Sequence, residues 1–207
     1  MSSQNKTGLV IGCSGKIGSG KNYLAETKIF DTLHEMGKNV VVMAFGDYLK
    51  MMCLVKDGIS YDKLFYDKDQ QTRKILQTRG MKERETDDMI FIKMLECHMK
   101  IAFDRNIDVI IISDLRFNIE FEFLKSLNAV LFRVNAPKRT YDKMIKECVG
   151  DEKAVAEIAK HVSEIELDLR NDFDHYLDND YEHEESVVDE ISDIMKKIVK
   201  SRIMSNE

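Results

Sequence analysis

A short glycine-rich segment near the start of the chain has the residue types and spacing of a phosphate-binding loop. It follows an apolar run at residues 9–11. Gly15, Gly20 and Lys21 match the template G-x-x-x-x-G-K-[S/T], whereas Asn22 replaces its hydroxyl residue. Glycines let successive backbone N–H groups surround phosphate oxygens, and the lysine adds a positive charge. We expect nucleotide phosphates to bind Gly15, Lys16, Gly18, Ser19, Gly20, Lys21 and Asn22.

The replacement at Asn22 bears on metal binding. A Ser or Thr hydroxyl normally holds Mg²⁺ at this position. An amide oxygen can also coordinate Mg²⁺, so Asn22 is a candidate metal ligand, and Ser19 is an alternative source of a hydroxyl. The replacement argues against the GTPase and motor-ATPase classes. The absence of an Asn-Lys-x-Asp guanine-reading motif argues against a nucleotide switch.

A second group of polar residues follows the apolar run at residues 109–112. Asp114 can hold Mg²⁺ or steer a substrate hydroxyl, and Arg116 can pair with a phosphate. The alternative is that Asp114 caps the helix expected to begin a few residues later. With a phosphate-binding loop on the neighbouring strand, we interpret Lys21, Asp114 and Arg116 as catalytic and Asp114 as a further metal ligand.

Two charged stretches, 46–86 and 137–171, do not fit a simple alternation of strands and helices. In the first, arginines offer the planar, bidentate contact that a phosphate monoester needs. In the second, cations that close over a nucleotide would stabilise charge in phosphoryl transfer, and Arg139 is the catalytic candidate. With no ligand bound, the cations of the two stretches should repel each other and leave the site open. The candidate substrate-binding residues are Asp47, Lys50, Arg73, Arg79, Arg84 and Glu164.

The elements that must position these residues alternate between short β-branched runs and long amphipathic stretches. This alternation predicts a three-layer α/β fold with a five-stranded parallel sheet. Ligands of such sheets bind at the carboxyl edge of the strands, where both charged stretches would lie as helical insertions. Strands are expected at 9–11, 40–45, 108–113, 129–134 and 173–177, and helices at 21–36, 87–103, 117–127 and 184–203.

Length and composition limit the number of domains, the class of partner and the location of the protein. The length of 207 residues suits a single domain over 1–207. A balance of 31 basic against 37 acidic residues argues against a protein that coats nucleic acid. The four cysteines form no CxxC pair, which favours reduced thiols and a cytoplasmic protein. The apolar runs are too short to span a membrane, and residues 1–7 lack the apolar core of a signal peptide.

Beyond the phosphate loop, the chain contains the motifs Phe-Gly-Asp-Tyr-Leu-Lys at 45–50, Gln-Thr-Arg-Gly at 77–80, Asp-Leu-Arg at 114–116, His-Val-Ser-Glu at 161–164 and Leu-Asp-Asn-Asp at 177–180. The order of these motifs resembles that of the deoxynucleoside monophosphate kinases of bacteriophages and large DNA viruses, which belong to the P-loop nucleoside monophosphate kinases. Animal-type phosphomevalonate kinase has a similar layout. The resemblance covers about residues 8–195 and implies a P-loop kinase fold, ATP and Mg²⁺, an acceptor-binding insertion at 46–86 and a lid at 137–171. It also assigns Asn179 to nucleotide binding.

Three functions therefore remain open. The first is transfer of the ATP γ-phosphate to a deoxynucleoside monophosphate. The second is a kinase for another phosphorylated small molecule, such as phosphomevalonate or dephospho-coenzyme A. The third is a P-loop module that binds nucleotide without turnover. All three imply small-molecule partners and binding to neither membrane nor nucleic acid. The expected location is the cytoplasm, or that of the host if the chain is viral. A homodimer is compatible with each function.

Overall fold

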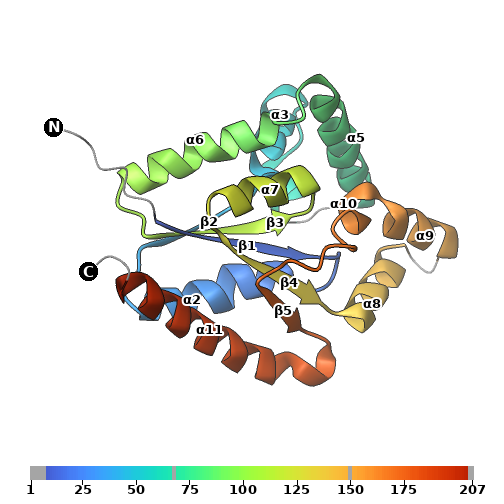
Figure 1. Ribbon diagram of the computed structural model, residues 1–207. Helices are drawn as coiled ribbons and strands as arrows, with labels where there is room; N and C mark the ends of the chain where they lie inside the picture. The colour runs from blue at the N-terminus through green and yellow to red at the C-terminus, as the bar shows by residue number, and fades with distance from the viewer. Residues whose placement is uncertain (1–7, 67–68, 149–150, 205–207) are drawn as a thin grey trace.

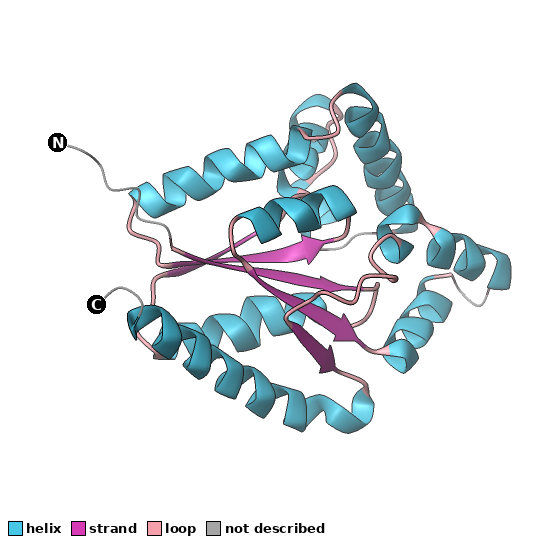
Figure 2. Ribbon diagram, viewed as in Figure 1, coloured by secondary structure: helices cyan, strands magenta, loops and turns pink. Residues whose placement is uncertain are grey.

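A single parallel sheet with helices on both faces forms the body of the protein in the computed structural model (Figures 1 and 2). The structure describes residues 8–66, 69–148 and 151–204. The strand order is β2-β3-β1-β4-β5, and every pairing is parallel. The predicted three-layer fold with five parallel strands is confirmed. The strands are β1 (Leu9–Gly15), β2 (Val40–Met43), β3 (Val109–Leu115), β4 (Val130–Asn135) and β5 (His175–Asp178).

Alternate residues of the central strands enter two separate cores. Ile110 and Ile112 of β3 pack in the core beneath α6 and α7, whereas Val109 and Ile111 pack in the core on the opposite face. All four side chains are at most 2% exposed. The continuous apolar run of β3 therefore reflects a strand that is covered on both sides. The covering helices are α6 (Ile90–Asp104) and α7 (Asn118–Ser126) on one face, and α2 (Phe30–Glu35) and α11 (Glu184–Met204) on the other.

The helix after the phosphate loop is continuous but not uniform. It begins as α1 (Lys21–Tyr23), passes through a π-helical segment η1 (Leu24–Ile29) and ends as α2. Gly37 follows it with φ of 74°, the left-handed conformation that commonly ends helices. The helix predicted over 21–36 is therefore present, with its positive end directed at the phosphate loop.

Both charged insertions fold as helices at the carboxyl edge of the sheet (Figure 1). They are separated along the chain by α6, β3, α7 and β4, yet both lie at the same edge. No helix in the described part of the chain is long and apolar enough to cross a bilayer. The first insertion contains α3 (Asp47–Lys56), α4 (Tyr61–Phe65) and α5 (Gln70–Thr86); the second contains α8 (Pro137–Glu147), α9 (Glu152–Lys160) and α10 (Val162–Ile165). A 3-10 turn η2 (Tyr181–His183) precedes α11.

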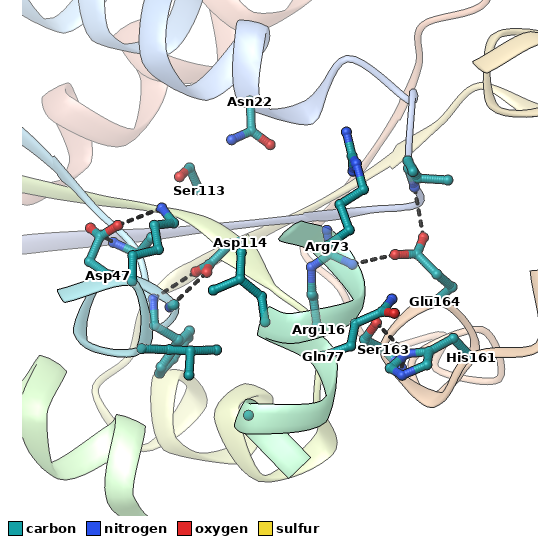
Figure 3. Close-up of a pocket in the computed structure, with 18 of the residues that line it drawn as sticks. Asn22, Asp47, Arg73, Gln77, Ser113, Asp114, Arg116, His161, Ser163 and Glu164 are labelled. Atoms are coloured by element: carbon teal, nitrogen blue, oxygen red, sulfur yellow. Dashed lines mark hydrogen bonds and ion pairs between the residues drawn. The ribbon is translucent and has the colours of Figure 1, made fainter. Parts of the chain in front are cut away.

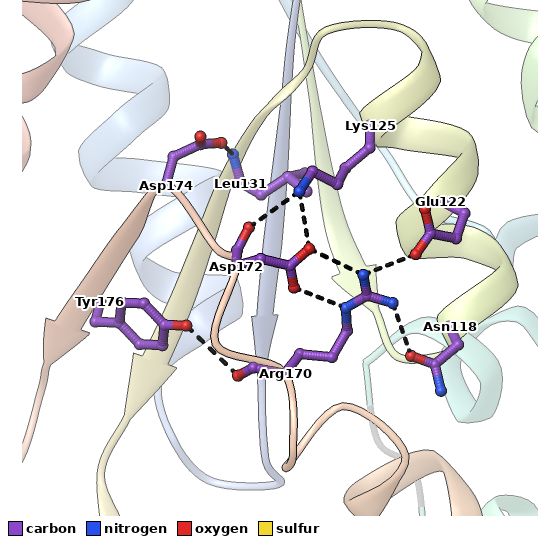
Figure 4. A network of polar contacts seen from close by, with 8 residues as sticks. All are labelled: Asn118, Glu122, Lys125, Leu131, Arg170, Asp172, Asp174 and Tyr176. Atoms are coloured by element: carbon purple, nitrogen blue, oxygen red, sulfur yellow. Dashed lines mark hydrogen bonds and ion pairs between the residues drawn. The ribbon is translucent and has the colours of Figure 1, made fainter.

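A polar network fixes the chain where it returns from the second insertion to β5 (Figure 4). Arg170 pairs with Asp172 at 2.9 Å and with Glu122 of α7 at 2.7 Å, and Lys125 reaches Asp172 at 2.8 Å. The guanidinium also lies 3.8 Å from the ring centre of Phe121. Hydrogen bonds from Arg170 and then Lys125 hold the pKa of Asp172 well below its usual range. The base of the second insertion is thus anchored to α7, while its helices extend over the sheet edge.

Candidate active site

A cleft of about 1330 Å³ opens at the carboxyl edge of the sheet, between the phosphate loop and the two insertions (Figure 3). Lys21 and Asn22 line it from the phosphate loop, and Asp114 and Arg116 line it from the end of β3. The cleft therefore brings Gly18, Lys21 and Asn22 of the nucleotide-binding candidates together with Asp114 and Arg116. From the insertions it receives Asp47, Lys50, Arg73, Arg84 and Glu164 of the predicted residues.

The shape of the phosphate loop depends on glycine and on a brace from the end of β5. Gly18 and Gly20 have φ of 74° and 81°, a conformation that other residues rarely adopt. A Cβ on Gly20 would lie 2.3 Å from Nδ2 of Asn179. That amide donates a 2.8 Å hydrogen bond to the backbone oxygen of Ser19, and Asn179 is 2% exposed. The structure thus places Asn179 behind the loop, where it supports the nucleotide site from outside the cleft.

Burial controls the charge of Lys21. The side chain is 5% exposed, and its burial, followed by the nearby positive charge of Arg116, lowers its pKa to about 7. The carboxylates of Glu164 and Asp114 act in the opposite direction. Phosphates bound at the loop would bring further negative charge next to the ammonium and favour its protonated form.

Asp114 connects β3 to the first insertion. Its two carboxylate oxygens accept hydrogen bonds from the backbone N–H groups of Phe45 at 2.7 Å and Gly46 at 2.9 Å. The alternative in which Asp114 caps α7 is wrong, because Glu120 accepts the backbone N–H groups of Arg116 and Phe117 there. Asp114 therefore fixes the start of the insertion relative to the phosphate loop.

The residues near Asn22 fit a metal held mainly by a nucleotide. The Asn22 amide group donates to Glu26 at 2.9 Å, which leaves its carbonyl oxygen available as a ligand. Ser113 and Asp114 line the same side of the cleft (Figure 3). The described residues contain no cluster of three or more His, Cys, Asp or Glu side chains suited to a metal. Mg²⁺ in kinases commonly takes only one or two protein ligands and completes its shell with phosphates and water.

Arg84 is the most firmly held cation on the acceptor side. It pairs with Glu120 at 2.8 Å and stacks against Phe117 at 3.9 Å and Phe91 at 4.5 Å from the ring centres. Glu120 is 2% exposed, and burial, followed by repulsion from Asp114, raises its pKa to about 7. Rings and carboxylate together fix the plane of the guanidinium, as bidentate binding of a phosphate requires.

An ion pair joins the two insertions across the cleft. Arg73 of α5 lies 2.9 Å from Glu147 of α8, and Lys143 lies 3.1 Å from the same carboxylate. We expected cations of the two insertions to repel each other. Glu147 instead supplies a negative charge between them, so that part of the predicted repulsion is replaced by attraction. No local sequence pattern indicates this contact, because Arg73 and Glu147 are 74 positions apart.

Arg79, which was predicted to bind the acceptor, lies outside the cleft. Arg79 pairs with Glu83 at 2.9 Å and Asp57 at 3.4 Å. The cleft face of α5 instead carries Arg73, Gln77 and Arg84, whose spacing of four and seven follows one side of a helix. Placing Arg79 in the acceptor site is therefore corrected: it lies two residues from Gln77, on another face.

Arg139 is corrected in the same way. Its guanidinium lies 4.7 Å from the ring centre of Tyr181, and its backbone N–H donates to Asp180. Lys143, one turn further along α8, is the cation of that helix that lines the cleft. Lys16 also points elsewhere, since it pairs with Asp168 at 2.7 Å.

Three aromatic side chains line the acceptor side of the cleft and were missed in the sequence. Tyr61 stacks on Phe65 with ring centres 4.5 Å apart, and Tyr66 meets Tyr61 edge-on at 5.8 Å. Tyr61 is 50% and Tyr66 76% exposed, so their surfaces are open to a ligand. The pattern Tyr-x-x-x-Phe-Tyr was the available signal. The cleft also contains Glu26, Gln77, Ser113, Glu120, Lys143 and Glu147, which sequence reasoning did not select.

The parallel sheet, the loop ending in Gly20-Lys21 and the cleft of cations define a P-loop kinase. The chain belongs to the phosphomevalonate kinase family, whose family model matches residues 13–129. The match includes the phosphate loop, the first insertion and Asp114-Leu115-Arg116. The match supports the similarity to phosphomevalonate kinase that the order of the motifs indicated. A deoxynucleoside monophosphate as the acceptor stays a prediction.

Solved structures give a more distant likeness. Shikimate kinase from Bacteroides thetaiotaomicron is 11% identical, with a TM-score of 0.46 over 93% of this chain and 98% of that chain. Shikimate kinase from Acinetobacter baumannii in complex with shikimate is 12% identical, with a TM-score of 0.46 over 98% of this chain and 96% of that chain. No curated protein matches the chain in sequence.

Gly20 and Gly37 form a matched pair for testing the loop, because both have positive φ but only Gly20 has a close neighbour for an added Cβ. We expect Gly20→Ala to abolish ATP binding measured by calorimetry. Gly37→Ala should lower the free energy of unfolding by about 1 kcal/mol and leave binding unchanged. Equal ATP affinity in both variants would contradict the role of the loop.

The lowered pKa of Lys21 predicts proton uptake on nucleotide binding. At about pH 8.5 a lysine of pKa about 7 is mostly neutral, and adjacent phosphates raise its pKa, so that binding should take up nearly one proton. ATP affinity should accordingly fall as the pH rises above about 7. Calorimetry in buffers of different ionisation enthalpy measures the uptake. Lys21→Met should lose it; the same uptake in that variant would contradict the assignment.

Proposed function

We propose that this protein transfers the γ-phosphoryl group of ATP to a deoxynucleoside monophosphate. The observation that carries the proposal is the aromatic cluster of Tyr61, Phe65 and Tyr66 in the same cleft as Arg84 and the phosphate loop. Open aromatic faces suit stacking of a nucleobase, and a fixed guanidinium suits the phosphate of the same molecule.

Each part of the cleft has a distinct task in this reaction. The loop N–H groups and Lys21 bind the ATP phosphates and stabilise the charge that develops during transfer. Arg116 lies beside them at the end of β3 and is suited to contact the transferred group. Asn22, Ser113 and Asp114 are the residues that would hold Mg²⁺, directly or through water. When bound, the metal would neutralise negative charge on the phosphates as it develops during transfer.

The family match supports phosphomevalonate as a second candidate acceptor. That molecule carries a carboxylate as well as a phosphate on a branched aliphatic chain, so it needs two groups of cations and no aromatic surface. Lys50 and Arg73 line the cleft in addition to Arg84 and offer such a second group. Lys50, however, lies 4.7 Å above the Phe65 ring and pairs with Asp47 at 2.7 Å, which places it beside the aromatic cluster.

An ADP-release assay separates the candidates. The panel contains deoxynucleoside monophosphates, ribonucleoside monophosphates, phosphomevalonate and dephospho-coenzyme A, each with Mg-ATP. We expect the highest kcat/KM with a deoxynucleoside monophosphate. Preference for phosphomevalonate would replace the proposed acceptor and keep the kinase. No ADP release with any acceptor, together with tight ATP binding, would favour a binding module without turnover.

Arg84 and Arg79 provide an internal comparison on one helix. Arg84→Ala should raise the acceptor KM by a factor on the order of ten to a hundred, because it removes a charge-assisted contact of about 1.5–3 kcal/mol. Its effect on the ATP KM should be small. Arg79→Ala should leave both KM values within about two-fold of wild type. A larger rise in acceptor KM for Arg79→Ala than for Arg84→Ala would refute the placement of the acceptor phosphate.

A further inference from the structure

A carboxylate from the second insertion contacts the phosphate loop directly. Oε2 of Glu164 accepts a 2.7 Å hydrogen bond from the backbone N–H of Ile17, and Oε1 forms an ion pair with Arg116 (Figure 3). The Glu164 side chain is 5% exposed. A buried carboxylate needs such partners, and both of its oxygens have one.

The local sequence directs Glu164 toward the loop. His161 caps α10: its Nδ1 accepts the backbone N–H of Ser163 at 3.3 Å and contacts the Ser163 hydroxyl at 2.8 Å. Glu164 occupies the third position of this helix, from which a glutamate commonly reaches back to its own N-cap. Here the histidine performs the capping, and the carboxylate extends to a loop 147 positions earlier in the chain.

The two donors that hold Glu164 are also donors that a nucleotide phosphate needs. Ile17 belongs to the segment whose N–H groups surround phosphates in a P-loop. Arg116 is the cation next to that segment at the end of β3, and the carboxylate also favours the charged form of Lys21. The negative charge of Glu164 therefore lies where the terminal phosphates of ATP are expected.

We propose that Glu164 is an internal counter-anion, which holds the phosphate loop and Arg116 in this conformation and is displaced when a triphosphate binds. Displacement frees Arg116 to contact the phosphates and moves α10 away from the loop. The inference rests on the proposed function only in requiring that the loop bind phosphates. It revises the prediction that Glu164 binds substrate, because a carboxylate in this position competes with a phosphate for the same donors.

Calorimetric binding of inorganic tripolyphosphate tests the proposal without an acceptor, a base or turnover. Glu164→Gln removes the competing charge and should bind tripolyphosphate at least about ten-fold more tightly than wild type, as expected when a charge-assisted contact no longer competes. Glu166→Gln is the matched control. This substitution also replaces a glutamate carboxylate, two residues further along the chain, where Glu166 accepts the backbone N–H of Asn118 at 2.6 Å. The Glu166→Gln variant should bind tripolyphosphate like wild type.

Amide NMR of the wild-type protein gives a readout that does not depend on a variant. Tripolyphosphate should shift the Ile17 amide and increase hydrogen exchange in residues 162–165. Equal or weaker binding by Glu164→Gln, or an Ile17 amide that stays bonded to Glu164 at saturation, would overturn the proposal. If wild type then still transfers phosphate, the proposed function survives. Failure of wild type to bind tripolyphosphate at all would overturn both.

Discussion

Positive charge buried at the end of β1 is the constraint on which the cleft depends. Lys21 is almost inaccessible to water and has Arg116 and Arg133 nearby. Repulsion between cations this close together at a low-dielectric site destabilises the folded protein unless anions lie nearby. The second insertion supplies two: Glu164 for Arg116, and Asp168 for Arg133 at 2.6 Å. The insertion was expected to bring cations to the nucleotide, and at the loop itself it brings carboxylates.

The two sides of the cleft are stiffened by different means. On the nucleotide side, the positive-φ glycines, the Asn179 amide and the Glu164 carboxylate hold the loop. On the acceptor side, Arg84 is held by aromatic rings and by Glu120, while Arg73 depends on a carboxylate of the other insertion. Both sides of the cleft therefore depend on how the insertions are placed, the nucleotide side through Glu164 and the acceptor side through the pair of Arg73 and Glu147.

The sequence predicted the strands, the main helices and the phosphate loop because each depends on local pattern. A short apolar run such as residues 109–112 is interpreted as a buried strand of a parallel sheet when amphipathic helices precede and follow it. The face of α5 was harder to predict. Polar and charged residues occupy most of that helix, so no apolar stripe fixed its rotation, and Arg79 was assigned to the cleft in place of Gln77. Pairs such as Ile17 with Glu164 and Arg73 with Glu147 arise only when distant segments pack, and no spacing in the sequence encodes them.

The hydrogen bond between Asn179 and Ser19 joins residues 160 positions apart, and it has a consequence for how the protein is made. The glycine-rich motif leaves the ribosome well before its brace, because Asn179 follows Ser19 by 160 positions. A nascent chain that has completed β1 to β4 still lacks β5 and the amide that supports the loop. Competence to bind a nucleotide should therefore arise only after β5 and Asn179 have docked, because contacts so far apart in sequence form only after the intervening chain has folded.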